Sequence, residues 1–405
     1  MLDFDPLTVA WGLLGLAGGA LVLYAAALVA TWMHMRRRPE RAPDDALPPV
    51  SLLKPLKGLE DGFDANLRSF FAQRYPASLE ILFSATEADD PGLARAKELA
   101  LEFPDVPVRF IVSDPDFGLN PKVANLAGAL RAARYDLVHQ SDANVRVPPT
   151  YLRDIVGEMV ASRASMLTSP VVGVGEATPG AAMENLQLSA FIAPAMCLAL
   201  KAVRITCVCG KSMLFHRSEL EADFGGLASV RNVLCEDFVL GERYKAAGRR
   251  LVLSVTPVEN VNRDCGVDRF LERHGRWLKM RATLHVPGFV ADLLSNPIAL
   301  AALAVLLSGF DRGILGAAAL LTLAKAAADQ VGVRLTREPL PLRYAWLGPA
   351  KDLLLLPLWL SAVFGRTVIW RGQRLRFGKN TELLPLDPGP GDAGLAPQPT
   401  LDDAR

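Results

Sequence analysis

The chain has 405 residues and a formal net charge of +1, so no overall positive field favours nucleic acid as a partner. Hydrophobic residues make up 51% of it and the mean hydropathy is +0.22, which is high for a water-soluble enzyme. Its five cysteines form no CxxC pair and no zinc-type Cys/His spacing, which argues against a zinc domain and fits a reducing compartment.

The first expected element is a transmembrane anchor over residues 1–35. Residues 7–33 carry no charge, and a helix of that length extends roughly 40 Å, enough to cross a bilayer with some tilt. Three arginines follow the run at positions 36–38, whereas a cleavable signal peptide has its positive charge before the apolar stretch. The positive-inside rule therefore places the chain after Arg36 in the cytosol.

A Pro-, Ala- and Asp-rich linker over residues 36–49 leads into a predicted α/β domain over residues 50–285. In its first half, short apolar runs alternate with helical patterns, which predicts a mostly parallel, doubly wound sheet. The expected strands cover 50–53, 79–84, 108–112 and 137–138, and the expected helices cover 66–72, 91–102 and 121–133.

The second half of this domain is less regular. The patterns predict strands over 166–172, 205–216 and 251–255, and helices over 149–161, 179–200, 235–247 and 267–283. A Gly-Lys-Ser turn at 210–212 interrupts the second of these strands. Cys207 and Cys209 alternate along it, so we expect them to pack as small apolar side chains.

Residues 286–365 are predicted to be membrane segments. Apolar runs cover 298–310, 313–333 and 344–364, and the expected arrangement is a hairpin turning at Asp311-Arg312 plus a re-entrant or interfacial segment. Residues 365–381 contain five basic residues and no acid, which predicts a cytosolic tail facing lipid headgroups. The tail domain, 366–405, is expected to be first basic and then disordered, because its end is rich in Pro, Gly and Asp.

A pair of oxygen-bearing side chains follows the strand at 137–138. Asp142 and Asn144 stand two positions apart, so in extended chain their side chains share one face. The carboxyl end of a central strand is where open α/β sheets bind ligands. The pair suits Mg²⁺ or Mn²⁺ that takes its other oxygens from water and a substrate phosphate. The alternative is an Asx-rich turn that simply leaves the strand.

Two further acids occupy comparable positions. Asp90 and Asp237 each begin a predicted helix, so Asp90 has the alternative role of N-cap and Asp237 that of favourable charge in a first helical turn. Together with Asp142 they fit the needs of a nucleotide diphosphate: one acid near the nucleoside, one for the metal ion and one acting as a base.

The helix over 267–283 presents Arg273, Arg276 and Trp277 on one face through i, i+3 and i+4 spacing. Arginines grip phosphate oxygens through forked hydrogen bonds, and an aromatic ring can stack on a sugar or a lipid headgroup. The alternative is an amphipathic helix lying near the membrane surface.

Six short motifs occur in the chain in a fixed order. They are Lys54-Pro-Leu-Lys57-Gly58, Asp89-Asp90-Pro91, Asn120-Pro-Lys122, Asp142-Ala-Asn144-Val-Arg146-Val147, Glu236-Asp237-Phe238 and Arg273-His-Gly-Arg276-Trp277. This ordered set resembles the ceramide glucosyltransferase family, including the related bacterial hopanoid glycosyltransferases. The resemblance extends from about Pro48 to Lys379, and Glu87 is a departure, because an Asp often stands there in the family.

The resemblance implies a GT-A type nucleotide-sugar fold and inverting transfer of a hexose, Glc or GlcNAc, from a UDP-sugar to a membrane lipid hydroxyl. The acceptor it implies is ceramide or a polyhydroxylated hopanoid. By the resemblance Asp90, Asp142 and Asp237 are the three spaced aspartates of the family, with Asp237 as the base. The implied substrate-binding residues are Asp90, Lys122, Glu236, Arg273, Arg276 and Trp277, and the implied metal ligands are Asp142 and Asn144.

Two other functions fit parts of the sequence. A processive polysaccharide synthase also carries a QxxRW-like motif, but its secretion channel needs more spans than this chain offers. A membrane-anchored scaffold with an inert nucleotide-sugar fold would not need all three aspartates and the RxxRW motif. Because the composition is rich in Ala, Arg and Gly, we expect a GC-rich bacterium as the source. The apolar runs and the charges beside them predict a multi-pass protein of its cytoplasmic membrane with a cytosolic catalytic domain. No oligomeric state is predicted.

Overall fold

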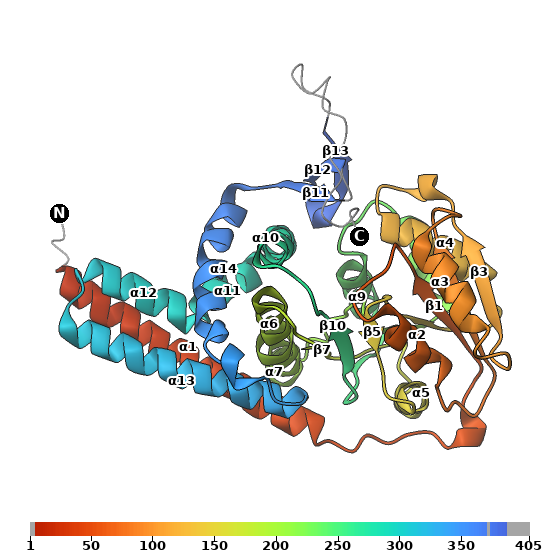
Figure 1. Cartoon of the computed structure of the whole chain (residues 1–405), viewed down its shortest axis with the longest axis horizontal. Helices are drawn as coiled ribbons and strands as arrows, with labels where there is room; N and C mark the ends of the chain where they lie inside the picture. The colour runs from red at the N-terminus through yellow and green to blue at the C-terminus, as the bar shows by residue number, and fades with distance from the viewer. Residues whose placement is uncertain (1–4, 371–372, 387–405) are drawn as a thin grey trace. The chain divides into compact units, whose positions relative to one another are not determined.

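The computed structural model describes residues 5–370 and 373–386 (Figure 1). The chain forms two compact units, and each is discontinuous in sequence. The helical unit comprises Met1–Arg36, Val172–Val203 and Asn262–Arg366; the α/β unit comprises Arg37–Val171, Arg204–Val261 and Thr367–Arg405. The domain expected over 50–285 is therefore divided between the two units, which are described separately below.

The α/β unit is built on a seven-stranded sheet, which confirms the predicted mostly parallel arrangement. Only β8 runs antiparallel to its neighbours. The central strands of the sheet, such as β1 and β2, are buried along nearly their whole length, as expected for strands that are covered on both faces. In spatial order the strands are β3 (Val108–Val112), β2 (Leu79–Ala85), β1 (Val50–Pro55), β4 (Leu137–Gln140), β8 (Met213–His216), β6 (Met166–Thr168) and β9 (Leu251–Leu253).

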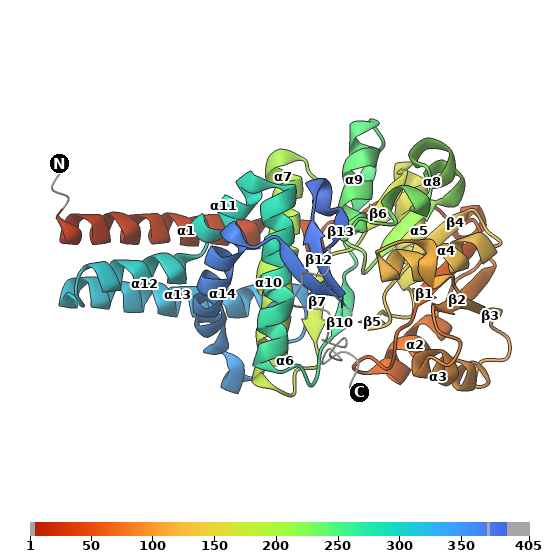
Figure 2. The ribbon, with the colours of Figure 1, turned by 90° about the horizontal axis from the view of Figure 1, so that it is seen from above.

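Helices connect and cover these strands, and α4 packs against β1 and β2 (Figure 2). Asp90 and Asn120 cap α3 and α4, and a proline follows each of them at the first helical position. The helices of this unit are η1 (Asp44–Ala46), α2 (Phe63–Phe71), α3 (Pro91–Ala100), η2 (Pro115–Phe117), α4 (Pro121–Ala132), α5 (Tyr151–Ser162), α8 (Arg217–Phe224), η4 (Leu227–Val230), α9 (Glu236–Ala246) and η6 (Lys379–Thr381).

The strand order reverses between β1 and β4. From β1 the chain first extends the sheet through β2 and β3, and then returns to place β4 on the other side of β1. The carboxyl ends of two such strands border a crevice that is the usual ligand site of an open α/β sheet. The loop carrying Asp142 leaves β4 at this crevice and continues into β5 (Val145–Arg146), which pairs with β10 (Val258–Val261).

The strand predicted over 205–216 forms only over Met213–His216, so the prediction is wrong for residues 205–212. Residues before it are irregular because their backbone groups have other partners. The Cys209 amide donates to Thr168 Oγ1 at 3.1 Å, and the Ser212 amide donates to Cys209 O at 3.1 Å, closing a turn. Cys207 and Cys209 therefore do not alternate along a strand.

The tail predicted to be basic and then disordered forms a three-stranded antiparallel sheet over much of its length. Its strands are β11 (Thr367–Trp370), β12 (Gln373–Phe377) and β13 (Leu383–Pro385). Residues 387–405, where disorder is expected, lie outside the described residues. The sequence contains a short strand signal here, because Arg374 and Arg376 alternate with Leu375 and Phe377, but the charge of the segment was interpreted as that of a basic tail.

This C-terminal sheet holds the segment that leads into α9. The Leu383 amide donates to Asn232 O at 2.7 Å, and the Leu234 amide donates to Thr381 O at 3.0 Å. Thr381 Oγ1 also accepts the Cys235 amide at 3.3 Å. The end of the chain thus braces the residues immediately before Glu236 and Asp237.

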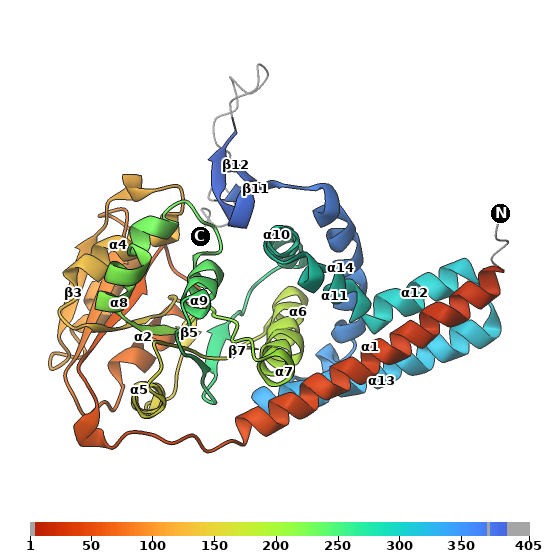
Figure 3. The ribbon, with the colours of Figure 1, turned by 180° about the vertical axis from the view of Figure 1, so that it is seen from behind.

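In the helical unit, α1 (Pro6–Met35), α12 (Pro297–Leu307) and α13 (Arg312–Thr336) lie side by side (Figure 3). Small side chains fill the contact, among them Ala10, Ala301 and Ala304, which let helix backbones approach closely. The hairpin turn is where the sequence indicates it, because Asp311 caps α13 by accepting the Gly313 amide at 2.9 Å.

Of the remaining elements of this unit, α10 packs against α6, α11 and α14. Within the part of the chain that the structure describes, four helices are long and apolar enough to cross a membrane, namely 6–35, 179–203, 312–336 and 347–364, and a bent pair over 286–307 makes up to five. For the segment over 179–203 the sequence predicted a helix but not a possible membrane span. The elements are β7 (Val171–Val174), α6 (Pro179–Leu186), the π-helical turn η3 (Gln187–Ile192), α7 (Ala193–Val203), α10 (Val267–Leu284), α11 (Val286–Leu294), η5 (Leu342–Tyr344) and α14 (Leu347–Phe364).

The charges that interrupt the apolar runs of α13 and α14 neutralise one another. Lys325 Nζ lies 2.7 Å from Asp329 and 2.9 Å from Asp352, and Lys351 pairs with Asp352. Tyr24 of α1 donates to Asp329 at 2.8 Å. Two cations and two anions are therefore buried as a compensated network, which removes most of the cost of placing them among apolar helices.

Candidate active site

A buried lysine holds the loop that carries Asp142 through a hydrogen bond to the backbone of that loop. Lys54, at the end of β1, donates from Nζ to the Asp142 carbonyl oxygen at 2.6 Å and lies 3.6 Å from the centre of the Phe70 ring. Burial lowers the pKa of Lys54 well below its usual value, although the charge of Asp142 acts in the opposite direction. The contact joins β1 to the loop after β4 across the crevice.

The Asp142 carboxylate lies between two ammonium groups. Its Oδ1 is 3.1 Å from Lys122 Nζ, and its Oδ2 is 3.0 Å from Lys211 Nζ. Lys211 Nζ also donates to Asn144 Oδ1 at 2.7 Å. Burial alone would raise the pKa of Asp142, but the two lysines hold it well below the usual range, so the carboxylate stays ionised.

Lys122 extends the cluster to the start of α9. Its Nζ is 3.1 Å from Glu236, as well as 3.1 Å from Asp142. Burial alone would lower the pKa of Lys122, but the carboxylates of Asp142, Glu236 and Asp237 together raise it well above its usual value. Burial also raises the pKa of Glu236, and the neighbouring Asp237 adds to this shift.

Asp237 is held by two backbone amides. Its Oδ2 accepts from Gly210 N at 2.6 Å, and its Oδ1 accepts from Phe238 N at 2.8 Å. Gly210 is required by close approach, because a Cβ there would lie 2.5 Å from Lys122 Nζ and 3.1 Å from Asp237 Oδ2. The turn over 209–212 thus orients two parts of the site. Gly210 orients Asp237, and Lys211 orients Asp142 and Asn144.

The structure therefore brings together five of the sequence-predicted site residues: Lys122, Asp142, Asn144, Glu236 and Asp237. In this cluster the Lys122 and Lys211 ammonium groups face the carboxyl groups of Asp142, Glu236 and Asp237. A diphosphate entering such a site brings negative charge that the cluster alone leaves without a counter-charge.

Asp90 has backbone partners in the structure. Its Oδ1 accepts from the amides of Gly92 and Leu93 at 2.8 and 3.1 Å, and its Oδ2 accepts from Gly58 N at 2.9 Å. The side chain is buried and acts as the N-cap of α3 while tying the loop after β1 to that helix. Its contact with a nucleoside stays a prediction.

Arg273, Arg276 and Trp277 lie on α10 in the helical unit, so their predicted contact with the diphosphate also stays a prediction. Glu184 of α6 anchors the motif, because it lies 3.1 Å from Arg273 and 3.0 Å from His274. Trp277 contacts the His274 ring edge-on, with the ring centres 4.9 Å apart.

Sequence reasoning missed three residues of these sites: Lys54, Lys211 and Glu184. Lys54 belongs to the first of the six motifs. A lysine at the end of a buried strand needs a polar partner, and this requirement could have predicted its contact with a neighbouring loop. Lys211 stands in the Gly-Lys-Ser turn, which was interpreted only as an interruption of a strand. Glu184 follows apolar residues on a helix and has no local signal that names its partners.

Among the described residues, no group of three or more His, Cys, Asp or Glu side chains could hold a metal ion. The oxygens of Asp142 and Asn144 nevertheless converge on a single cation, the Lys211 ammonium. One carboxylate and one amide oxygen fit a divalent ion that completes its shell with water and substrate phosphates. The donor set therefore fits Mg²⁺ or Mn²⁺, provided that Lys211 moves aside.

A solved structure supports the fold assignment. The chain is similar to mannosyltransferase PcManGT from Pyrobaculum calidifontis, solved with GDP-Man and Mn²⁺, with a TM-score of 0.50 and 18% identity, covering 89% of this chain and 99% of that one. This likeness confirms the GT-A type fold that the sequence predicts.

The chain also has relatives by sequence. The chain is 25% identical over 401 residues to ceramide glucosyltransferase 1 of Caenorhabditis elegans, covering 93% of this chain and 84% of the relative. It is 28% identical over 247 residues to the ceramide glucosyltransferase of Komagataella phaffii, covering 54% and 48%. The family model for glycosyl transferase family 21 matches residues 17–383. With the motifs and the fold, this match shows that the chain is a hexosyltransferase that belongs to glycosyl transferase family 21.

Proposed function

We propose that this ceramide glucosyltransferase-like enzyme moves a hexose, Glc or GlcNAc, from a UDP-sugar to the hydroxyl of a membrane lipid with inversion at the anomeric carbon. The observation that carries the proposal is the cluster of Lys122, Lys211, Asp142, Glu236 and Asp237 at the reversal point of the sheet. It combines cations for a diphosphate with a carboxylate fixed in place for a base.

Lys211 binds the diphosphate directly, and Asp142 with Asn144 would act on it through a divalent cation. That cation would supply counter-charge to the diphosphate as UDP leaves. Lys211 then no longer has to neutralise Asp142, so its ammonium is free to contact a phosphate oxygen. Lys122, which stays between Asp142 and Glu236, keeps Asp142 ionised and holds both carboxyl groups in place.

Asp237 takes the proton from the lipid hydroxyl as that oxygen attacks the anomeric carbon on the face opposite UDP. The two backbone amides hold its carboxylate in one orientation, so little reorganisation is needed when the proton arrives. Arg273, Arg276 and Trp277 act on the diphosphate and acceptor at the membrane surface. The acceptor is ceramide or a polyhydroxylated hopanoid.

The purified full-length protein in detergent, given UDP-Glc or UDP-GlcNAc with ceramide or a polyhydroxylated hopanoid, tests the function. We expect a single hexose added to one lipid, detected by mass spectrometry. A polymer released without lipid would favour a polysaccharide synthase instead. Failure to modify either lipid with either donor would contradict the proposal.

Lys211→Met should raise KM for the UDP-sugar about tenfold, because one charge-assisted hydrogen bond to the diphosphate is lost. The methionine keeps the side-chain length, so the turn over 209–212 is preserved. Lys245→Met is the matched control, because Lys245 is an exposed lysine of α9 that pairs only with Glu242 in the structure described here, at 3.6 Å. Equal KM values for the two variants would remove Lys211 from the donor site.

We also propose that the α/β unit and the C-terminus face the cytosol of a bacterium, where UDP-sugars are made. The charge asymmetry supports this, with three arginines directly after the anchor and five basic residues over 365–381. A reporter active only in the cytosol should be active when fused after Arg405 and silent when fused before Met1. The reverse pattern would overturn the topology.

A further inference from the structure

The helical unit contains a pocket whose wall includes Trp277 of the RxxRW motif. It is partly open to the outside and lies between η3, α10, α11, α13 and α14. Aromatic and leucine side chains form most of its wall. They are Phe191, Trp277, Leu278, Leu355, Leu356 and Trp359.

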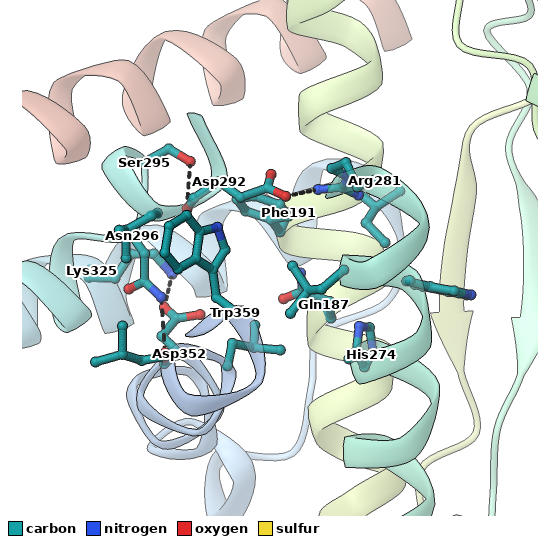
Figure 4. Close-up of a pocket in the computed structure, with 16 residues that line it drawn as sticks. Gln187, Phe191, His274, Arg281, Asp292, Ser295, Asn296, Lys325, Asp352 and Trp359 are labelled. Atoms are coloured by element: carbon teal, nitrogen blue, oxygen red, sulfur yellow. Dashed lines mark hydrogen bonds and ion pairs between the residues drawn. The ribbon is translucent and has the colours of Figure 1, made fainter. Parts of the chain in front are cut away.

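One wall of this pocket carries a polar atom that lacks a partner. Gln187 is 6% exposed, and its Oε1 is buried with no hydrogen-bond partner among the residues described. Figure 4 shows Gln187 and Phe191 directed toward the same space as Trp359. Gln187 begins the π-helical turn η3, a local irregularity that is common at functional sites. A buried acceptor of this kind calls for an N–H or O–H donor from a ligand.

The charges around the pocket compensate one another. Arg281 pairs with Asp292, and Lys325 lies 2.9 Å from Asp352, as the dashed lines in Figure 4 mark. His274 is engaged by Glu184 at 3.0 Å. Among its described residues the wall therefore has no unpaired charge of either sign that would attract a charged ligand, and a neutral polar ligand is favoured.

The aromatic wall is already in place. Trp359 Nε1 donates to the Phe289 carbonyl oxygen at 2.8 Å, and its ring stacks on Phe289 with centres 4.6 Å apart. With its N–H satisfied, the indole presents an apolar surface that suits hydrocarbon. Since α13 and α14 are among the helices apolar enough to cross a membrane, a lipid could enter from the bilayer.

We propose that this pocket binds the neutral, hydroxyl- or amide-bearing head and adjoining hydrocarbon of the acceptor lipid, with Gln187 Oε1 accepting a hydrogen bond from that head. This inference rests on the proposed function and deepens it, because it names the residues that distinguish the acceptor from bulk phospholipid. Gln187 is a specificity residue in this proposal, and it takes no part in the proton transfer.

Photo-cross-linking of the wild-type full-length protein in lipid nanodiscs, without nucleotide sugar, tests the site. The probe is a ceramide whose acyl chain carries a diazirine and an alkyne. We expect labelling of Phe191, Leu355 or Leu356, displaced by unlabelled ceramide and not by phosphatidylethanolamine. Labelling confined to other segments, or displaced equally by phosphatidylethanolamine, would overturn the proposal.

Gln187→Leu should weaken cross-linking and raise KM for ceramide about tenfold, with kcat and UDP affinity unchanged, since one hydrogen bond to a buried acceptor is lost. Gln330→Leu is the matched control, because Gln330 is also in the helical unit with a buried Nε2 that has no partner among the described residues, yet it does not line the pocket. Equal effects of the two variants would overturn the role of Gln187.

The two proposals fail separately. Specific labelling of the pocket without sugar transfer to ceramide or to a polyhydroxylated hopanoid would leave the pocket standing and contradict the proposed function. Sugar transfer to ceramide without labelling of the pocket would leave the proposed function standing and contradict the pocket.

Discussion

Replacing Asp237 with asparagine should lower kcat by about a thousandfold, because the amide cannot accept the proton of the attacking hydroxyl. The asparagine side chain fills nearly the same space. Its single carbonyl oxygen can accept a hydrogen bond from the backbone N–H of either Gly210 or Phe238, but not from both at once. UDP affinity should therefore change little. Single-turnover transfer with saturating UDP-sugar measures the chemical step, and calorimetry with UDP measures binding.

Asp223→Asn provides a matched control for this experiment. Asp223 is an aspartate of the same unit that pairs with exposed Arg249 near the end of α8. We expect wild-type kcat from this variant. If Asp237→Asn retains a substantial fraction of wild-type turnover, Asp237 is not the base, and an equal loss of UDP affinity would point to a binding role.

Asp142→Ala should abolish the metal dependence of UDP binding. In the wild type, EDTA should weaken UDP affinity at least about a hundredfold, and Mg²⁺ or Mn²⁺ should restore it, since a divalent ion on a diphosphate contributes several kcal/mol. In the variant, the affinity should be weak and the same with or without chelator. Calorimetry at matched ionic strength measures both, because lysine contacts to phosphate are sensitive to salt.

The control for this second prediction is Asp64→Ala, which removes a carboxylate that pairs with Arg95 on α3 of the same unit. It should keep the full response to chelator. Wild-type activity in EDTA would contradict the metal assignment, and Asp142 would then serve to fix Lys122 and Lys211 for a metal-independent site.

The sequence predicted those parts of the fold where local pattern and tertiary role agree. Asp90 and Asn120 precede prolines and cap α3 and α4 as expected, and the apolar runs of β1, β2 and β4 are buried strands. The cluster around Asp142 was likewise predictable, because the ends of neighbouring strands meet at one edge of a sheet.

Other features depend on partners far away in sequence. Lys211 lies in the part of the predicted strand over 205–216 that does not form, and its role appears only when Asp142 and Asn144 are brought beside it. The strands β12 and β13 were missed because the arginines of β12 were interpreted as a basic tail and because the two strands pair only after η6 reverses the chain. No window of sequence records that Thr381 accepts the amides of residues before α9.

The contact of Thr381 and Leu383 with residues 232–235 sets an order for biosynthesis. All helices of the helical unit precede residue 367 in the chain, so they leave the ribosome before the strands that brace the approach to Asp237. A nascent chain therefore cannot complete the support of Asp237 until its apolar helices have been made. Transferase activity would be acquired only once residues 381–383 have been made, after the apolar segments have had time to enter the membrane.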